Sequence, residues 1–520
     1  MFWLNEIAEK IIEKKDKKTF LVADWNTPSG KAHIGSMRGV VIHDIIRHAL
    51  AKNGKSAIFQ YGFDDFDSMD GFPNYLPAEF KKYMGMSFSN IPSPEKGYKN
   101  MGEYFARYFQ NVFESLGIMP KIVYTSELYK KGIFNDSIKI ALENADKIRE
   151  IYFRISKSKK DDDWYPLNVT CEKCGKIGTT KVYDYDKKNK LVKYKCMPKM
   201  VEWAEGCGHE GVISPFDGNA KLPWKVEWPS KWHIFKNDVE GEGKDHFVAG
   251  GSRDVADHIA RIIFNENPPF DVPYEHFYLN GKKMSSSKSL GVFAGDVLAV
   301  TQPEILKFLM VRTRPKKAIE FNIEGETIPL LYDEYDRCID AYLADPNSDL
   351  GQAYYYSKIG DGAISEYRLR FSKIVYLLQM FRTNIEKYAL EEKGMELTKI
   401  ELQELKLREH YAKLWLDKYA PDKYKFKIQD KMPAAAKDLD ESQKEFLKEI
   451  STKLDEKKWK GEELHEELHN IKNSLHLDPR KAFSAIYLSL LGKDFGPQAG
   501  WLIASLDKKF IKSRFEEIVK

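Results

Sequence analysis

Cysteine is scarce in this sequence, and long apolar runs are missing altogether. Five cysteines among 520 residues are too few for a disulfide framework. No stretch of about 18 consecutive apolar residues is found, so we expect no membrane span. The first residues, MFWLNEIAEKIIEKKDKK, lack the apolar core and the small-residue cleavage site of a signal peptide. These absences favour a cytoplasmic protein.

The sequence also lacks a strong excess of either charge. Its 82 basic residues are balanced by 78 acidic ones, and the net charge is only +4. That balance neither requires nor excludes a nucleic-acid partner. No internal repeat or low-complexity tract is found. The length exceeds what one hydrophobic core usually supports and predicts roughly two to four domains.

The first part of the chain has the order strand, loop, helix, strand. Thr19–Asp24 has the apolar character of a buried strand, Met37–Lys52 the period of a helix, and SAIFQYG (56–62) the character of a second strand. This βαβ order predicts a parallel, doubly wound α/β sheet. Further helices are expected near Met101–Leu116 and Asn135–Arg154.

The composition and periodicity of the sequence change twice beyond these helices. From about Pro166 to Trp228 the chain consists of short β-like pieces, glycines and most of the cysteines. Apolar strands and helices then return in DHFVAGG, VADHIARIIF, YEHFYLNG and PEILKFLMVR. Beyond about Ile328 the period is helical, with helices expected at Ile364–Lys387, Leu397–Lys418 and Gln443–Lys457. The sequence therefore predicts one sheet interrupted by an insertion and followed by a separate all-helical domain.

The segment after the first strand can bind an anion. It reads TPSGKAHIGS, from Thr27 to Ser36, and places a tight Pro/Gly turn between a strand and the start of a helix. Backbone N–H groups and the positive end of the helix dipole then meet at the carboxyl edge of the sheet. His33 would face a phosphate there, and Gly35 would let a nucleobase approach the backbone closely. The alternative is a surface turn with Ser36 as a helix cap.

A second segment, GKKMSSSKS from Gly281 to Ser289, follows an apolar strand. It is rich in ammonium groups and hydroxyl donors. Such a loop could close over a triphosphate and neutralise the departing pyrophosphate. The alternative is a flexible basic linker.

Together the two segments resemble the PSGxxHxGx and KMSKS signatures of the class I aminoacyl-tRNA synthetases. The resemblance implies a Rossmann-type sheet split by a connective insertion, and a reaction that uses ATP with Mg²⁺. It also implies that Gly243 and Asp245, in the turn GKDHFVAGG, contact adenine and the ribose hydroxyls, although without the family this is simply a turn. The implied catalytic residues are His33, Lys283 and Lys288, and the implied ATP-binding residues are Pro28, Gly35, Ser36, Gly243, Asp245, Met284, Ser285, Ser286 and Ser287.

Two positions depart from these signatures. Ser36 stands where many members have a second histidine. Ser286 stands where the second lysine of KMSKS usually falls, so Lys288 could take that role only if the loop is reshaped. Some phosphate binding would then pass from lysine and histidine to hydroxyl groups.

Most of the chain is similar to the class I lysyl-tRNA synthetases in particular. The similar segments are TPSGKAHIGS, DDFD (64–67), SELYKKG, GKDHFVAGGS, KKMSSSKS, LYDEYDR and DPRKAFSAIYLSLLGKDFGPQAGWLIASLD. The resemblance implies attachment of L-lysine to tRNA(Lys), with the helical domain binding the anticodon. One rival is a glutamyl-type class I synthetase, which would need a basic residue facing the amino-acid side chain. The other is a non-catalytic RNA-binding relative, which would be expected to lack His33, Gly35 or Lys283.

A lysine pocket needs an acid for the ammonium group and aromatic walls for the aliphatic stem. The acids expected at the carboxyl edge of the sheet are Asp24, Asp64, Asp65 and Asp67. The resemblance adds Thr27, Trp228 or Trp232, His246 and Tyr274. The alternative for 64–67 is a turn with a helix cap, and for His246 a core histidine. Trp25 stands where the family often has a small residue, so it either forms a pocket wall or displaces the pocket.

Four of the five cysteines cluster along the chain and predict a structural zinc site. They are Cys171, Cys174, Cys196 and Cys207. The first pair has knuckle spacing, whereas the second pair is looser, and His209 is a rival ligand to Cys207. The alternative is four free thiols. Cys338 lies in a helical pattern and is expected in a core.

The expected limits of the parts follow from these motifs. They are a first Rossmann half at 1–95, a connective insertion with the zinc knuckle at 96–222, a second Rossmann half with the KMSKS-type loop at 223–290, a stem-contact region at 291–330 and a helical anticodon-binding domain at 331–520.

Overall fold

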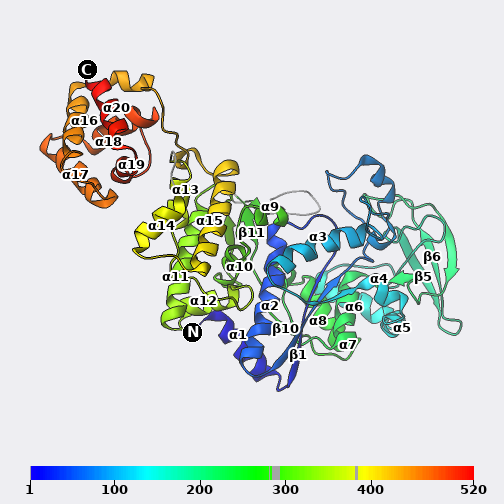
Figure 1. Ribbon diagram of the computed structural model, residues 1–520. Helices are drawn as coiled ribbons and strands as arrows, with labels where there is room; N and C mark the ends of the chain where they lie inside the picture. The colour runs from blue at the N-terminus through cyan, green and yellow to red at the C-terminus, as the bar shows by residue number, and fades with distance from the viewer. Residues whose placement is uncertain (1, 280–281, 284–292, 381–383) are drawn as a thin grey trace. The chain divides into compact units, whose positions relative to one another are not determined.

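The computed structural model describes residues 2–279, 282–283, 293–380 and 384–520 (Figure 1). The chain divides into two compact units. The first consists of Met1–Ala299, Pro303–Phe321 and Arg337–Asp361, and the second of Val300–Gln302, Asn322–Asp336 and Gly362–Lys520. Over the described ranges, no helix is long and apolar enough to cross a membrane.

A five-stranded sheet forms the centre of the first unit, with the strand order β10-β9-β1-β2-β3. Its strands are β1 (Thr19–Asn26), β2 (Ser56–Phe63), β3 (Lys121–Tyr124), β9 (Val239–Glu240) and β10 (Phe270–Asp271). Every neighbouring pair is parallel, so the carboxyl ends of all the strands lie at one edge. The predicted parallel α/β sheet is confirmed, and this edge is where such sheets bind ligands.

The first βαβ unit follows the sequence closely. Between β1 and β2, the 3-10 turn η1 (Ile34–Ser36) leads directly into α2 (Met37–Lys52). All residues of α2 from Met37 to Ile46 are buried, because the helix lies inside the unit rather than on its surface. Helices α1 (Trp3–Lys14) and α3 (Met101–Ser115) complete this half. The strands and the helix expected here are confirmed.

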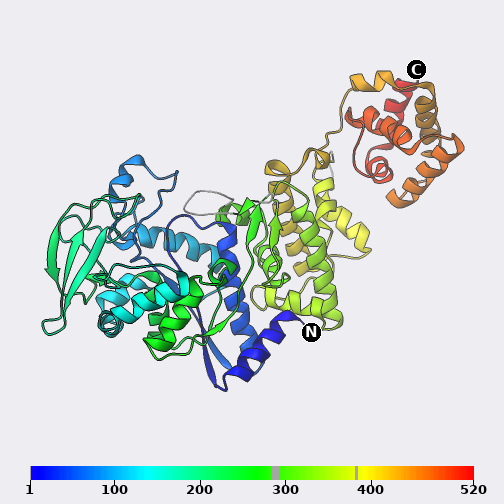
Figure 2. The ribbon, with the colours of Figure 1, turned by 180° about the vertical axis from the view of Figure 1, so that it is seen from behind.

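The chain leaves the sheet after β3 and returns to it at β9. Between them lie α4 (Thr125–Lys130), α5 (Asn135–Glu143), α6 (Ala145–Ser156), β4 (Asn168–Val169), β5 (Thr180–Asp186), β6 (Leu191–Cys196), β7 (Glu210–Ile213), β8 (Ala220–Lys221) and α7 (Trp224–Phe235). Strands β5, β6 and β7 form a separate antiparallel sheet (Figure 2). The parallel sheet therefore runs on through β3, beyond residue 95 where its first half was expected to end. The single helix expected at 135–154 is two helices that meet at Asn144.

The second half of the first unit holds α8 (Ser252–Ile262), α9 (Ala294–Leu298), α10 (Pro303–Val311), α12 (Asp349–Ser357) and a small sheet of β12 (Lys282–Lys283), β11 (Phe277–Leu279) and β13 (Ile319–Phe321). The elements expected in VADHIARIIF, YEHFYLNG and PEILKFLMVR are confirmed. The segment DHFVAGG, expected among the returning strands and helices, follows a strand and contains no strand of the parallel sheet. Lys244–Phe247 forms the 3-10 turn η4, and the strand of the sheet, β9, comes just before it.

The second unit is helical wherever it is described. Besides part of α11 (Thr327–Ala344), it contains α13 (Phe371–Leu377), α14 (Ile385–Lys393), α15 (Lys399–Lys418), α16 (Glu441–Lys453), α17 (Gly461–Ser474), α18 (Pro479–Leu491), α19 (Ala499–Ser505) and α20 (Lys508–Val519). Helices α15 and α16 confirm two of the expected helices, and capping boxes at Thr398 and Asp440 fix their starts. The helix expected at Ile364–Lys387 is wrong at its beginning. The Arg368 guanidinium donates to the carbonyls of Ser365 and Glu366, and α13 begins only at Phe371.

Candidate active site

A cavity of about 680 Å³ opens at the carboxyl edge of the parallel sheet. Residues that follow β1, β2 and β9 line it together with side chains of α7 and of the insertion. Its polar and aromatic lining consists of Asp24, Trp25, Asn26, Thr27, Ser29, Asp64, Asp67, Ser68, Asp70, Asn168, Trp203, Lys221, Trp224, Glu227, Trp228, Lys231, Glu240, Glu242 and His246. Acidic side chains outnumber basic ones in this lining, so the cavity favours a cationic ligand.

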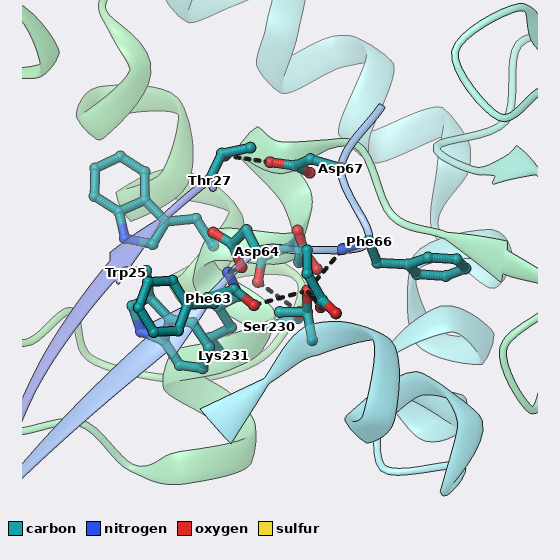
Figure 3. Close-up of polar contacts among 12 residues, drawn as sticks. Trp25, Thr27, Phe63, Asp64, Phe66, Asp67, Ser230 and Lys231 are labelled. Carbon is teal, nitrogen blue, oxygen red and sulfur yellow. Dashed lines mark hydrogen bonds and ion pairs between the residues drawn. The ribbon is translucent and has the colours of Figure 1, made fainter. Parts of the chain in front are cut away.

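Two of the expected aspartates already have lysine partners, and Figure 3 shows Asp64 with Lys231 and Asp67 with Thr27. Asp64 accepts a hydrogen bond from Lys231 Nζ at 2.5 Å, and that ammonium lies 4.1 Å from the centre of the Trp25 ring. Asp67 accepts from Thr27 Oγ1 at 2.6 Å and forms an ion pair with Lys221 Nζ at 2.9 Å. The charges of both aspartates are therefore balanced by the protein itself.

These two lysines are buried but remain charged. Burial alone would lower the pKa of Lys221 and of Lys231, but the carboxylates around them raise it. Lys221 also contacts Glu227, which gives its ammonium a second acidic partner. Carboxylate partners of this kind offset the cost of burying a cation. The pairs form a fixed part of the cavity wall.

Asp65 points away from the cavity and caps a helix. Its carboxylate accepts hydrogen bonds from the Ser126 backbone N–H (2.8 Å), from Ser126 Oγ (2.5 Å) and from Thr125 Oγ1 (3.3 Å), at the start of α4. The side chain is 3% exposed, and Asp65 is not among the residues that line the cavity. For this residue the structure matches the alternative expectation, a turn that caps a helix.

Asp24 differs from Asp64 and Asp67 because no lysine or arginine of the described residues balances its charge. Its Oδ1 accepts from the Trp25 backbone N–H at 2.9 Å, and its Oδ2 lies 3.4 Å from His43 Nδ1. Burial raises the pKa of Asp24 well above its usual value, and the negative charge of Glu240 raises it further. In the described part of the chain, no lysine or arginine forms an ion pair with Asp24.

His43 does not neutralise Asp24, because its ring is uncharged. Nδ1 lies 2.7 Å from the Gly39 carbonyl oxygen, to which it donates, and Nε2 accepts from the Gly241 N–H at 2.7 Å. Burial lowers the pKa of His43 to about 4. The hydrogen bonds fix the tautomer with the proton on Nδ1.

The aromatic side of the cavity is held by one carboxylate. Glu240 accepts from the indole N–H groups of Trp228 (2.7 Å) and Trp232 (2.8 Å). Trp224 stacks on Trp228 at 5.5 Å, and the His246 ring lies 5.8 Å from Trp228. Trp224, Trp228 and His246 line the cavity, whereas Trp232 is 1% exposed and lies behind them. Of the two expected tryptophans, Trp228 is the one that reaches the cavity.

Glu242, which also lines the cavity, has its own partner in Arg253. Arg253 Nη1 lies 3.0 and 3.2 Å from the two carboxylate oxygens. Burial raises the pKa of Glu242 well above its usual value, while the Arg253 charge opposes that effect. Glu242, like Asp64 and Asp67, is therefore already paired.

The turn that contains His33 and Gly35 packs against β11, although the two are far apart in the sequence. A Cβ atom on Gly35 would lie 3.0 Å from the His33 ring and 3.1 Å from Cβ of Phe277, in β11. Glycine is needed at this point because the His33 ring and β11 both pack against the backbone. The strand β12, which contains Lys283, pairs with β11. Ser36 makes no capping hydrogen bond, which disfavours the capping alternative.

The turn after β9 approaches the same place. Gly243 forms an isolated bridge with Tyr274, and the Lys244 N–H donates to the Tyr274 carbonyl oxygen at 2.9 Å. Among the described residues, no atom outside the chain neighbours of Gly243 lies within 4 Å of where its Cβ would be, so this backbone is open to a ligand there. Asp245 Oδ1 accepts from His276 Nε2 at 2.9 Å. Met284, Ser285, Ser286, Ser287 and Lys288 lie outside the described residues.

Comparison with known proteins identifies the family. The family described as "tRNA synthetases class I (K)" matches residues 1–359, and "Anticodon binding domain" matches residues 411–519. The lysine--tRNA ligase of Methanocaldococcus jannaschii is 35% identical over 99% of this chain and 99% of its own length. The lysine--tRNA ligase of Methanosarcina barkeri is 35% identical over 99% of this chain and 97% of its own length. That of Thermoplasma acidophilum is 31% identical over 100% of this chain and 99% of its own length. The chain belongs to the class I lysyl-tRNA synthetases.

In this class I lysyl-tRNA synthetase the four clustered cysteines come together in space. Their Sγ atoms all lie within 4.8 Å of one another, with Cys171 and Cys207 at 3.6 Å and Cys174 and Cys196 at 3.7 Å. Zinc bound tetrahedrally with Zn–S bonds of about 2.3 Å holds its sulfur atoms about 3.8 Å apart. The thiol set fits zinc, and the fourth member of the group is Cys207 rather than His209. Cys338 is buried in α11.

Several residues of the synthetase cavity carried no recognisable signal in the sequence. Lys221, Lys231 and Glu240 sit in segments without a motif, and Trp224 is one of ten tryptophans. The run WKVEWPSKW, with its tryptophans at every fourth position, could have indicated a helix with one aromatic face. Nothing in the local sequence indicated that Lys221 and Lys231 pair with Asp67 and Asp64.

Proposed function

We propose that this chain attaches L-lysine to tRNA(Lys) at the expense of ATP, through a lysyl-adenylate. The observation that carries this is the unpaired carboxylate of Asp24 inside an acidic cavity at the ligand-binding edge of the sheet. The full-length relatives share the name lysine--tRNA ligase. A glutamyl-type enzyme would need an unpaired cation facing the substrate side chain, but Lys221 and Lys231, the two lysines of this lining, are both ion-paired.

For the amino acid, the ε-ammonium of lysine pairs with Asp24. The aliphatic stem lies against Trp224, Trp228 and His246, which supply apolar contact and the faces of aromatic rings. Thr27, at the end of β1, and Tyr274 complete the pocket. Asp64 and Asp67 shape the wall through their lysine partners and do not bind the substrate ammonium. These roles rest on three observations: Asp64 and Asp67 have lysine partners, the Glu240 carboxylate accepts from two indole N–H groups, and Asp70 is exposed.

For ATP, His33 and Lys283 bind the phosphates, and the adenosine lies between Gly35 and the open backbone of Gly243. Pro28 and Ser36 belong to the same anion-binding turn, Asp245 would bind the ribose hydroxyls, and Lys288, Met284 and Ser285 to Ser287 would close over the triphosphate. Mg²⁺ accompanies ATP as part of the substrate and neutralises phosphate charge.

The reaction has two transfers and needs no protein nucleophile. The lysine carboxylate attacks the α-phosphorus of ATP, which forms a P–O bond and releases pyrophosphate. The terminal ribose hydroxyl of the tRNA then attacks the adenylate carbonyl and releases AMP. The protein orients the reactants and stabilises the charge that develops on the phosphates.

Two further parts of the synthetase support this reaction. The four-cysteine cluster binds a structural zinc ion that joins β6 to the loops around it, and four protein ligands leave no open position for catalysis. The helical second unit, which contains the segment matched as an anticodon-binding domain, binds the anticodon of the tRNA. Basic side chains there would contact phosphates.

The deciding experiment is aminoacylation of total tRNA with each amino acid in turn, with ATP, Mg²⁺ and tRNA present throughout. We expect acid-stable attachment of radiolabel with lysine alone. The matched control is His33→Ala, which should lose about two orders of magnitude in rate, as removal of one preorganised donor usually does. Charging with glutamate would overturn the assignment of the amino acid, and no charging with any amino acid would overturn the function.

A further inference from the structure

One buried arginine of the first unit lies outside every role described above. Arg38 is the second residue of α2, two positions after Ser36, and is 1% exposed. In the described part of the chain it forms no ion pair with a carboxylate. Burial lowers its pKa to about 10, so the guanidinium is still charged at neutral pH. Burial of an unpaired cation is costly, and an apolar side chain of similar size would avoid that cost.

All of its hydrogen bonds go to one short segment. Arg38 Nη2 donates to the carbonyl oxygens of Arg314 (3.0 Å), Pro315 (3.0 Å) and Lys317 (2.6 Å). Its Nε and Nη1 atoms are buried without a hydrogen-bond partner. The side chain is therefore fixed by three backbone carbonyls rather than by a counter-charge.

That segment leads into the small sheet that contains Lys283. It directly precedes β13, which pairs in parallel with β11, and the Ile319 N–H donates to the His276 carbonyl oxygen at 3.1 Å. The Pro315 carbonyl oxygen that Arg38 binds also accepts from the Glu275 N–H at 2.8 Å, just before β11. Strand β11 then pairs with β12, where Tyr278 lies opposite Lys283.

Arg38 thus connects the two segments that the proposed function places on ATP. The helix that contains Arg38 begins beside His33 and Gly35, and the sheet that Arg38 holds contains Lys283. Backbone carbonyls do not change charge, so this connection fixes a distance and does not depend on pH. A displacement of about 1 Å between reacting groups can cost on the order of a hundredfold in rate.

We propose that Arg38 is a positioning residue for adenylate formation. Through the carbonyls of Arg314, Pro315 and Lys317 it holds the sheet β12-β11-β13 in register with the helix that starts at HIGS. This inference rests on the proposed function. It adds a residue that touches neither lysine nor ATP and acts through the placement of Lys283.

The test compares Arg38→Met with Arg38→Lys in lysylation of tRNA at saturating tRNA. Arg38→Met removes all three hydrogen bonds, and we expect kcat to fall on the order of a hundredfold. The KM for lysine should change much less than kcat, because the Arg38 side chain donates its hydrogen bonds to carbonyls of residues 314–317 and not to a residue of the lysine pocket. Arg38→Lys can still donate to the same carbonyls and should retain most of the rate. Arg47→Lys, on the same helix but paired with Asp44, is the matched control and should match the wild type.

A double-mutant cycle with Lys283→Ala separates positioning from general structural damage. If Arg38 acts by placing Lys283, Arg38→Met should cost little more than about twofold once Lys283 is gone. Equal losses in both backgrounds, or an Arg38→Met variant with normal kcat, would overturn the inference. If Arg38→Met does not fold, Arg38→Gln takes its place in the cycle, with thermal melting as the check on folding. Wild-type protein that does not lysylate tRNA would overturn the proposed function instead.

Discussion

At the scale of single residues, the acids of the cavity differ in whether the protein already balances their charge. Asp64, Asp67 and Glu242 each have a lysine or arginine within 3.0 Å, whereas Asp24 has only a neutral histidine and a backbone N–H. A cationic ligand gains most from the acid that no protein cation neutralises. In the proposed function, the specificity of the cavity therefore depends on Asp24 more than on the number of acids around it.

Asp24→Asn should raise the KM for lysine by about thirtyfold or more, because loss of one partner of a buried charge pair usually costs at least 2 kcal/mol. The KM for ATP should change little. Steady-state lysylation with lysine as the varied substrate gives both values. Asp70→Asn is the matched control, since Asp70 also lines the cavity but is exposed. Unchanged lysine KM in Asp24→Asn would assign the ammonium to another acid.

The raised pKa of Asp24 predicts a pH dependence with a definite sign. Below that pKa the carboxyl is protonated and cannot pair with the ε-ammonium of lysine, which stays charged throughout this range. The KM for lysine should therefore fall as pH rises through the pKa of Asp24 and then level off. Measurement of lysine KM in wild type and Asp24→Asn over the same pH series checks this. A wild-type KM as flat as that of the variant would contradict it.

The ion pairs in the wall predict effects on stability. Lys231→Met leaves the Asp64 carboxylate buried without a cation and should destabilise the first unit by roughly 3–5 kcal/mol. The double variant Lys231→Met/Asp64→Asn should recover most of the free energy of unfolding lost in Lys231→Met, because it no longer contains the buried charge of Asp64. Lys236→Met, which removes an exposed lysine paired with Glu266, should cost no more than about 1 kcal/mol. Urea titration measures the three free energies of unfolding, and equal losses in the single and double variants would contradict the argument.

The acids could be predicted from the sequence, but not their partners. Asp24, Asp64 and Asp67 follow apolar strands, so the edge at which they gather follows from the fold. Asp64 and Lys231 are separated by 167 positions, and no local pattern links them. The sequence also could not distinguish Asp65, which caps α4, from its neighbours, because the direction of each carboxylate depends on where the turn places it.

At the scale of helices and strands, prediction succeeded where the spacing of apolar residues in the sequence matches the residues that are buried in the fold. The strand β1, the helix α2 and the strand β2 have apolar patterns that match their burial, and their bounds were predicted within two residues. β9 and β10 escaped prediction because each is two residues long and has no pattern of its own. At 364–370 the apolar residues have a helical period, but the Arg368 side chain binds the carbonyls that a helix would need.

The proposed zinc site predicts which element depends on metal. Wild-type protein should contain about one tightly bound zinc ion per chain, and Cys174→Ser should lose most of it, since structural zinc requires all of its ligands. The strands β5, β6 and β7 should then exchange their amide protons faster, while the parallel sheet keeps its protection. Metal analysis and hydrogen exchange measure the two effects. Cys338→Ala, which changes the cysteine of α11, should retain the zinc. Full zinc content in Cys174→Ser would contradict the assignment.

At the scale of the whole molecule, each unit has a hydrophobic cluster of its own. One cluster of the first unit includes Ile138, Tyr194 and Ile259, all of them buried. The cluster of the second unit includes Phe446, Leu468 and Phe515. No residue belongs to both clusters. Residues that share a hydrophobic core unfold together in one cooperative transition. We therefore expect each unit to unfold in a transition of its own.

Scanning calorimetry should therefore resolve two transitions. Ile138→Ala should lower the midpoint temperature of the first unit's transition only, and Leu468→Ala that of the second unit's transition only. Each substitution should reduce the free energy of unfolding of its unit by about 2–5 kcal/mol, because both side chains are fully buried. In the proposed function lysine and ATP bind the first unit. By mass action, these ligands should therefore raise the midpoint temperature of the first unit's transition only. Leu407→Ala, a change at an exposed leucine of the second unit, should leave both transitions in place. A single transition that both core substitutions lower would show instead that the units unfold together, and the anticodon-binding unit would then be energetically linked to the catalytic one.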